Sequence, residues 1–138
     1  QIINQADATY NFQAGNIRQN IPADYQGAPA KFDNQGTLTK TSTLEAGIHV
    51  KLDNSGTINL EAGTLSSTND FQNTGTVTIN AGSLAVTGNI SNAHQIKIES
   101  GSASLTGGGT NQGTIYVDID AALTLGGTFQ FTVGRRKM

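Results

Sequence analysis

The sequence contains no cysteine, and only two of its 138 residues are proline. The absence of cysteine excludes a disulfide framework, a thiolate nucleophile and a cysteine-based zinc site. No apolar run approaches the roughly 18 residues that a membrane-spanning helix needs. Charged residues are also scarce, at 13% of the chain, and the net charge of −2 gives no sign of the basic face expected of a nucleic-acid-binding protein.

Glycine, threonine, serine and asparagine are abundant, and isoleucine and valine are plentiful beside them. Disordered chains usually combine high net charge with few β-branched residues, so this composition argues against disorder. It favours β-structure with many tight turns over helices. The length fits one domain. The chain begins Gln1-Ile2-Ile3 without an initiating Met, so we expect a processed mature protein or a piece of a longer chain.

An internal repeat is the strongest signal in the sequence. Four gap-free copies of equal length begin at Asn54, Asn73, Asn92 and Asn111. A looser copy with one extra residue begins at Asn34. In each copy an alternating apolar and polar segment is followed by a turn, a second short apolar stretch and a third apolar position. Three short strands separated by turns in every copy predict one coil of a β-helix.

We therefore predict an all-β protein, a single-stranded parallel β-helix (β-solenoid) with about 19 residues per coil and about five coils. The predicted core is formed by the apolar residues of the first strand of each copy: Ile58, Leu60, Val77, Ile79, Ile96, Ile98, Ile115 and Val117. One coil buries too few apolar side chains to offset the entropy cost of ordering its backbone. Each coil therefore needs neighbours above and below it.

Asparagine and glycine recur at the first turn of the copies. We expect the asparagines to stack at one corner and to form a ladder of side-chain amides: Asn54, Asn73, Asn92 and Asn111. The glycines two residues later are expected to need a positive φ: Gly56, Gly75 and Gly113. The copy from Asn92 departs from this pattern, because His94-Gln95 replaces Gly-Thr. In the last copy Asp120 replaces the glycine that ends the strand.

The two ends of the chain differ from the repeat. We divide the chain into a cap or degenerate first coil at 1–33, β-helix coils at 34–129, and a C-terminal strand with a basic tail at 130–138. Solenoids need shielding at their ends. The C-terminal strand instead runs into Arg135-Arg136-Lys137 with no obvious polar cap. Since an unpaired strand is a template for another strand, we expect this end to be completed by further coils or by a neighbouring chain.

The repeat resembles a known family through three features: the motif N-x-G-T-[IV], the A-G or S-G that follows it, and the apolar residue before the next Asn. In these it is similar to the haemagglutinin-type repeats of filamentous haemagglutinin and related two-partner-secretion exoproteins, and to β-helical autotransporter passengers. The resemblance covers about residues 34–129. It implies a right-handed β-helix within a large extracellular adhesin or surface fibre.

Few residues point to chemistry at a site. Glu99, Asp118 and Asp120 face outward and are weak candidates for a Ca²⁺ site. Lys97 on the same face already supplies a counter-charge, so we expect a solvated surface with no metal and no cofactor. The two histidines lie on different copies, and no base is expected beside a nucleophilic hydroxyl. We therefore expect no catalytic residues and no enzyme activity.

These features favour a structural, non-enzymatic protein of the extracellular space or cell surface. We expect it to form a β-helical fibre or adhesin shaft by end-to-end coil stacking and strand pairing at its open ends. Its expected partners are further copies of itself in a homo-oligomer or filament, and host or cell-surface glycans, with no nucleic acid. The alternative is a carbohydrate-binding or polysaccharide-degrading β-helix acting through the outer face around Lys97, Glu99, Tyr116 and Asp118.

Overall fold

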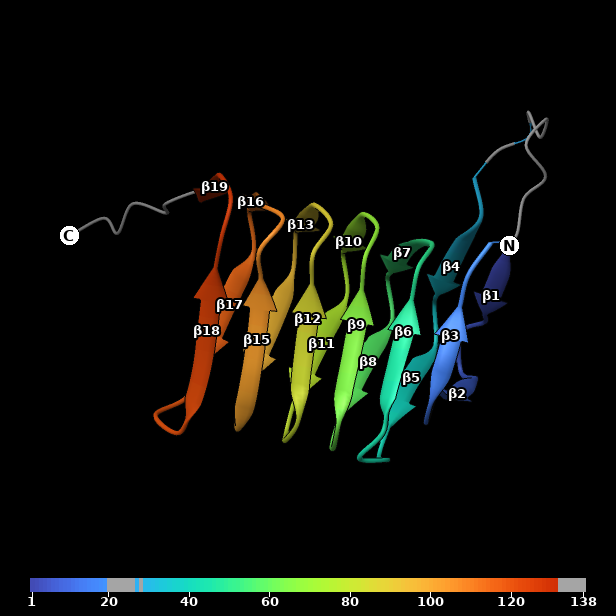
Figure 1. The fold of residues 1–138 in the computed structure, drawn as a ribbon, viewed down its shortest axis with the longest axis horizontal. Helices are drawn as coiled ribbons and strands as arrows, with labels where there is room; N and C mark the ends of the chain where they lie inside the picture. Colours follow the sequence, from blue (N-terminus) through green and yellow to red (C-terminus); the bar gives the residue numbers. More distant parts are fainter. Residues whose placement is uncertain (20–26, 28, 132–138) are drawn as a thin grey trace.

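The computed structural model describes residues 1–19, 27 and 29–131. This part of the chain is a parallel β-solenoid of nineteen short strands in three sheets, and it contains no helix (Figure 1). Each coil contributes one strand to each sheet, and the coils stack in chain order along the long axis of the molecule. The predicted all-β parallel β-helix with about 19 residues per coil is confirmed, and its right-handedness stays a prediction.

The three sheets are named A, B and C in the order in which a coil visits them. Sheet A consists of β1 (Ile2–Asn4), β4 (Lys31–Asn34), β7 (Lys51–Asn54), β10 (Phe71–Asn73), β13 (Ile90–Asn92), β16 (Gly109–Asn111) and β19 (Phe129–Phe131). Sheet B consists of β2 (Thr9–Asn11), β5 (Thr37–Lys40), β8 (Thr57–Leu60), β11 (Thr76–Ile79), β14 (Gln95–Ile98) and β17 (Thr114–Val117). Sheet C consists of β3 (Gly15–Ile17), β6 (Glu45–Ile48), β9 (Thr64–Ser67), β12 (Ser83–Val86), β15 (Gly101–Leu105) and β18 (Ala121–Leu125).

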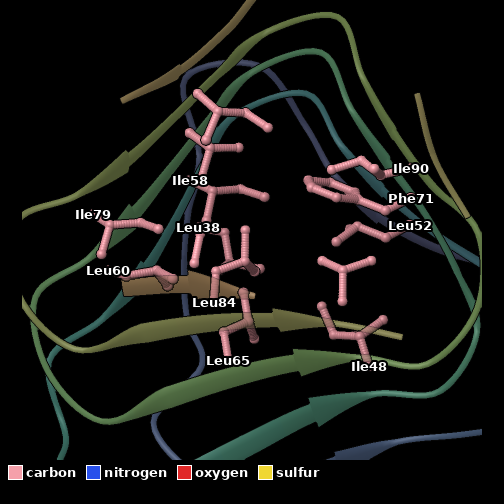
Figure 2. Close-up of a cluster of buried hydrophobic side chains, with 14 of the residues drawn as sticks. Leu38, Ile48, Leu52, Ile58, Leu60, Leu65, Phe71, Ile79, Leu84 and Ile90 are labelled. Carbon is pink, nitrogen blue, oxygen red and sulfur yellow. The ribbon is translucent and has the colours of Figure 1, made fainter. Parts of the chain in front are cut away.

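In-register pairing of the coils builds the core. Val77 of β11 pairs with Ile58 of β8 on one side and with Ile96 of β14 on the other. Because side chains alternate along a strand, this register stacks equivalent residues into continuous inward columns. Figure 2 shows columns from all three sheets meeting in the interior: Leu38 and Ile58 from sheet B, Leu52, Phe71 and Ile90 from sheet A, and Leu65 and Leu84 from sheet C.

Most of the predicted core residues are fully buried: Ile58, Leu60, Val77, Ile79, Ile96 and Ile98. Ile115 is only partly buried against the core, and Val117 is 39% exposed, so the prediction of a buried Val117 was wrong. Both residues lie on β17, which pairs with β14 on one side and has no second neighbour among the described strands. Their side chains continue the columns of Ile96 and Ile98 but lack a covering coil.

The described ends of the chain extend the solenoid in both directions. Within the predicted cap at 1–33, strands β1, β2 and β3 form a first coil in register with the second. The Tyr10 ring packs edge-to-face on Phe32 and Phe12, with ring centroids 5.2 and 6.0 Å apart. At the other end, β19 pairs with β16. The basic tail Arg135-Arg136-Lys137 lies outside the described residues.

The two coils that begin at Asn34 and Asn111 are longer by a single residue than the three regular coils between them, and both place it at the corner between sheets B and C. The turn between β5 and β6 has four residues, 41–44, where the next coil has three, 61–63. The turn between β17 and β18 has three residues, 118–120, where the preceding coil has two, 99–100. Both turns carry an exposed aliphatic side chain, since Leu44 is 62% and Ile119 is 93% exposed. A corner can therefore absorb an insertion without disturbing the strands.

The substitution Ile79→Asp tests the stacked core. Ile79 is fully buried between Leu60 and Ile98, so an aspartate there would be an unpaired charge in an apolar column. We expect a loss of several kcal/mol in the free energy of unfolding, about 3 or more. Thermal unfolding followed by circular dichroism measures it. Thr78→Asp, on the outward face of the same strand, is the control and should leave the melting temperature nearly unchanged.

Candidate functional site

A ladder of buried asparagine amides runs along the corner between sheets A and B. Except in the last asparagine, the Nδ2 donates a hydrogen bond to the Oδ1 of the asparagine in the next coil, at distances between 2.6 and 2.8 Å. The structure places the four asparagines singled out in the sequence in this ladder and adds two at its start: Asn4, Asn34, Asn54, Asn73, Asn92 and Asn111. The buried amides are thereby satisfied within the coil stack.

Asn4 was missed because it lies much farther from Asn34 along the chain than the repeat spacing, which hides the relationship. Asn34 had been recognised only as the start of the looser copy. Its pairing with Asn4 in strands β1 and β4 reveals the longer column. The ladder stops at Asn111, because Phe131 occupies the equivalent position on β19.

The structure corrects the reason given for the turn glycines Gly56, Gly75 and Gly113. None of the three has a positive φ, which occurs instead at the glycines that precede sheet C, such as Gly63 and Gly82. A Cβ added at any of the three would overlap the backbone of the preceding coil, where the nearest atom is a carbonyl oxygen. Close approach of successive coils, and not backbone conformation, therefore selects glycine at this turn.

In one coil His94 occupies the turn position that glycine holds in the neighbouring coils, and the backbone hydrogen bond beside it is longer. The hydrogen bond from Gln95 N to Gly75 O is 3.3 Å long. The equivalent bonds from Thr76 N and Thr114 N are 2.9 and 2.7 Å. His94 Nδ1 also lies 3.1 Å from Gly75 O. The coil spacing at this corner is therefore locally wider.

The outward acidic residues are engaged with their own neighbours. Glu99 and Asp118 hold equivalent positions in successive coils, since their N–H groups donate to Ile79 O and Ile98 O. The Glu99 carboxylate pairs with Lys97 at 2.6 Å, and Asp118 Oδ1 accepts the N–H of Ile119 at 2.7 Å. Asp120 is exposed on the same turn. Among the described residues no group of three or more His, Cys, Asp or Glu side chains is placed to hold a metal ion.

Lys97 connects the acidic column to Tyr116. Its ammonium lies 5.9 Å from the centroid of the Tyr116 ring, which is in the next coil and is 46% exposed. The hydrogen bond and the charge of Glu99 raise the pKa of Lys97. The surface considered for a carbohydrate is thus a set of side chains that contact one another, and no cavity described below includes them.

His49 contradicts the expectation that no base lies beside a hydroxyl. Its Nδ1 is 2.9 Å from Thr68 Oγ1, and its Nε2 is 3.0 Å from Asn16 Oδ1. With the proton on Nε2, the imidazole donates to Asn16 and accepts from the Thr68 hydroxyl. A Cβ at Gly47 would overlap both Asn16 Oδ1 and His49 Nε2, so this glycine makes room for the contact. The contact links three successive coils and could not be found from sequence spacing.

Lys40 is a buried polar residue that the sequence reading did not single out. It ends β5 at the inward position that Leu60 occupies in the next coil, and it is fully buried. Its Nζ donates to the carbonyl oxygens of Ser42 at 2.6 Å and Gln13 at 3.3 Å. Burial lowers the pKa of Lys40. The side chain ties the four-residue turn at 41–44 to the first coil.

Hollows in the surface lie along the corner between sheets C and A. A cavity of about 270 Å³ is lined by Lys51, Asp70, Phe71, Gln72, Asn89 and Ser91. A second, of about 190 Å³, shares Lys51 and Asp70 with it and is also lined by Gln19, Pro29, Ala30, His49, Val50 and Asn69. A larger one of about 720 Å³ lies at the N-terminal end over Ile2 and Val50. The linings of the second and of the larger cavity include residues that flank segments outside the described part, so we assign no ligand to either.

Comparison with protein-family models, with curated proteins and with solved structures finds no match to this chain. No helix long and apolar enough to cross a membrane occurs within residues 1–19, 27 and 29–131. The β-solenoid agrees with the repeats expected from the sequence. Functional conclusions therefore depend on the geometry described above.

Replacing Asn73 by Ala tests the amide ladder. Asn73 accepts from Asn54 and donates to Asn92, and both partners are buried. Losing the amide leaves a buried donor and a buried acceptor unpaired, so we expect the free energy of unfolding to fall by about 1–3 kcal/mol. Urea denaturation measures it. Asn80→Ala, an exposed asparagine of the same coil, should change stability by much less; equal effects would mean that the ladder contributes nothing specific.

The pKa of Lys40 predicts a pH dependence of stability. Its pKa is lowered from its ordinary value of 10.5 in the folded state, so unfolding takes up a proton between the folded value and 10.5. Stability from this group therefore rises as the pH increases toward 10.5 and is lost as the pH falls through the folded pKa. Urea denaturation at several pH values from about 8 upward compares the wild type with Lys40→Met.

We expect the wild type to gain stability relative to Lys40→Met as the pH rises over that range. Other titrating groups contribute equally to both proteins and cancel in the difference. Thr39→Met, on the outward face of β5, is the control that keeps Lys40 and should follow the wild-type curve. Parallel curves for the wild type and Lys40→Met would contradict a lowered pKa.

Proposed function

We propose that this chain is a structural, non-enzymatic segment of a β-helical fibre or adhesin shaft, extended by end-to-end coil stacking. One observation carries the proposal: every strand pair of the described chain joins equivalent strands of successive coils, in parallel and in register. Such an arrangement has no internal limit on its length. Each coil offers the next coil the same kind of strand edges and side-chain columns with which it pairs to the coil before it.

The last coil supports further extension. Strands β17 and β18 each have one neighbour among the described strands, so within residues 1–19, 27 and 29–131 no second strand pairs with their outer edges, and such an edge can pair with a further strand. Inward-pointing side chains on this coil remain exposed, with Val117 and Leu125 at 39% and Phe131 at 50%. Covering such side chains stabilises an added coil by the hydrophobic effect. The added coil belongs either to the same chain or to a second copy.

The location and family are proposals that rest on the resemblance of the repeat. The N-x-G-T-[IV] units resemble secreted haemagglutinin-type and autotransporter passenger repeats, so we propose the extracellular space or cell surface as its location. The absence of enzyme activity is proposed because the candidate polar residues bind one another. Lys97 pairs with Glu99, and the His49–Thr68 contact lies on the surface as a link between coils.

Negative-stain electron microscopy at micromolar concentration tests end-to-end stacking. We expect filaments with the width of one solenoid. The double variant Val117→Lys, Leu125→Lys should shorten or abolish them, because it puts charge into the surface that the next coil covers. The matched control Thr78→Lys, Ala85→Lys adds the same charge to outward positions of a central coil and should still form filaments.

Two results would contradict the proposal. Wild-type filaments that persist unchanged in the Val117→Lys, Leu125→Lys variant would place the contact elsewhere, and discrete wild-type particles would rule out stacking between copies. The triple variant Glu99→Ala, Tyr116→Ala, Asp118→Ala separates this function from the carbohydrate alternative. It should assemble normally, since these side chains lie outside the stacking columns.

A further inference from the structure

The cavity of about 270 Å³ lies across three coils at the corner between sheets C and A. Lys51 begins β7, and Asp70 and Asn89 directly precede β10 and β13. We name this surface, lined by Lys51, Asp70, Phe71, Gln72, Asn89 and Ser91, the corner groove.

Two outward columns supply the polar side chains of the groove. Lys51, Asp70 and Asn89 hold equivalent positions, because Leu52 N donates to Asp70 O and Phe71 N donates to Asn89 O. Gln72 and Ser91 are paired in the next outward column. Each coil therefore contributes one or two hydrogen-bonding side chains to the same line. These positions repeat at the spacing of adjacent strands, about 4.8 Å.

The groove offers donors and acceptors in a nearly neutral setting. Lys51 contributes a positive charge and Asp70 a negative one in adjacent coils, and Asn89, Gln72 and Ser91 can both donate and accept. Lys51 Nζ is 3.6 Å from Asp53 Oδ1. This mixture matches hydroxyl groups, which donate and accept, better than it matches phosphate or sulfate.

We propose that the corner groove binds a neutral, extended oligosaccharide that lies along the solenoid axis. A chain of β-1,4-linked sugars advances per residue by nearly the distance between coils, so each coil meets one sugar with its own polar side chains. Successive hydroxyl groups would contact Lys51, Asp70 and Asn89 in turn. A peptide strand is a poorer fit, because it pairs with a sheet edge and the groove lies over the side of the sheets. This site is separate from the Tyr116 surface and from the stacking columns.

Titration of the folded chain with cellohexaose and with chitohexaose, followed by two-dimensional amide NMR, tests the proposal. We expect at least one of these neutral hexasaccharides to bind with a Kd of about 1 mM or tighter. The shifted amides should belong to residues 51, 70–72 and 89–91. The double variant Asp70→Ala, Asn89→Ala should weaken binding by about 10-fold, the effect of two lost hydrogen bonds.

The control Thr76→Ala, Thr78→Ala removes two outward hydroxyls from sheet B in one of the same coils and should bind like the wild type. Amide spectra of both variants verify that the solenoid is folded. The proposal is overturned if neither sugar binds, if the Asp70→Ala, Asn89→Ala variant binds as the wild type does, or if a sulfated hexasaccharide alone binds. Filament formation is measured separately, so failure of the groove and failure of end-to-end stacking are distinguishable.

Discussion

Pairing between coils is the interaction on which this whole structure depends. Each described strand pair joins a strand to its equivalent in the coil before or after it, so a single coil holds no strand pairing of its own. Register follows from this constraint, because a shift of one residue would turn the apolar columns outward. The regular coils keep a constant length for this reason. The two longer coils place their extra residue at a corner, where the strands on either side keep their partners.

Stacking also explains how polar groups are tolerated in the interior. At the corner between sheets A and B, each asparagine amide satisfies the next, so the buried polar column costs no unpaired group except at its ends. Lys40 is a different solution at an irregular turn, since its ammonium contacts backbone carbonyls of two coils. The asparagine ladder is repeated along the stack, whereas the Lys40 contact occurs at one turn and is sensitive to pH.

Outward-facing side chains do not take part in the strand pairing or in the buried columns, so the outer surface differs from coil to coil. Equivalent outward positions on sheet B hold Thr78, Lys97 and Tyr116, whereas the corner before sheet A holds Lys51, Asp70 and Asn89. A solenoid with a fixed spacing between coils can therefore carry a binding surface along its side. The stacking columns and the groove use different residues, which allows the two proposed functions to coexist in one chain.

The sequence by itself determined the solenoid, because spacing along the chain carries the signal. The regular repeat predicted the coil, the alternation predicted most of the buried columns, and the asparagine spacing predicted four positions of the ladder. Tertiary structure decided what depends on the neighbouring coil. The exposure of Val117, the close backbone approach at Gly75 and the contact of His49 with Thr68 and Asn16 all arise from atoms in other coils. The corner groove belongs to the same class, because its residues lie about one coil apart in the chain and meet only when the coils stack.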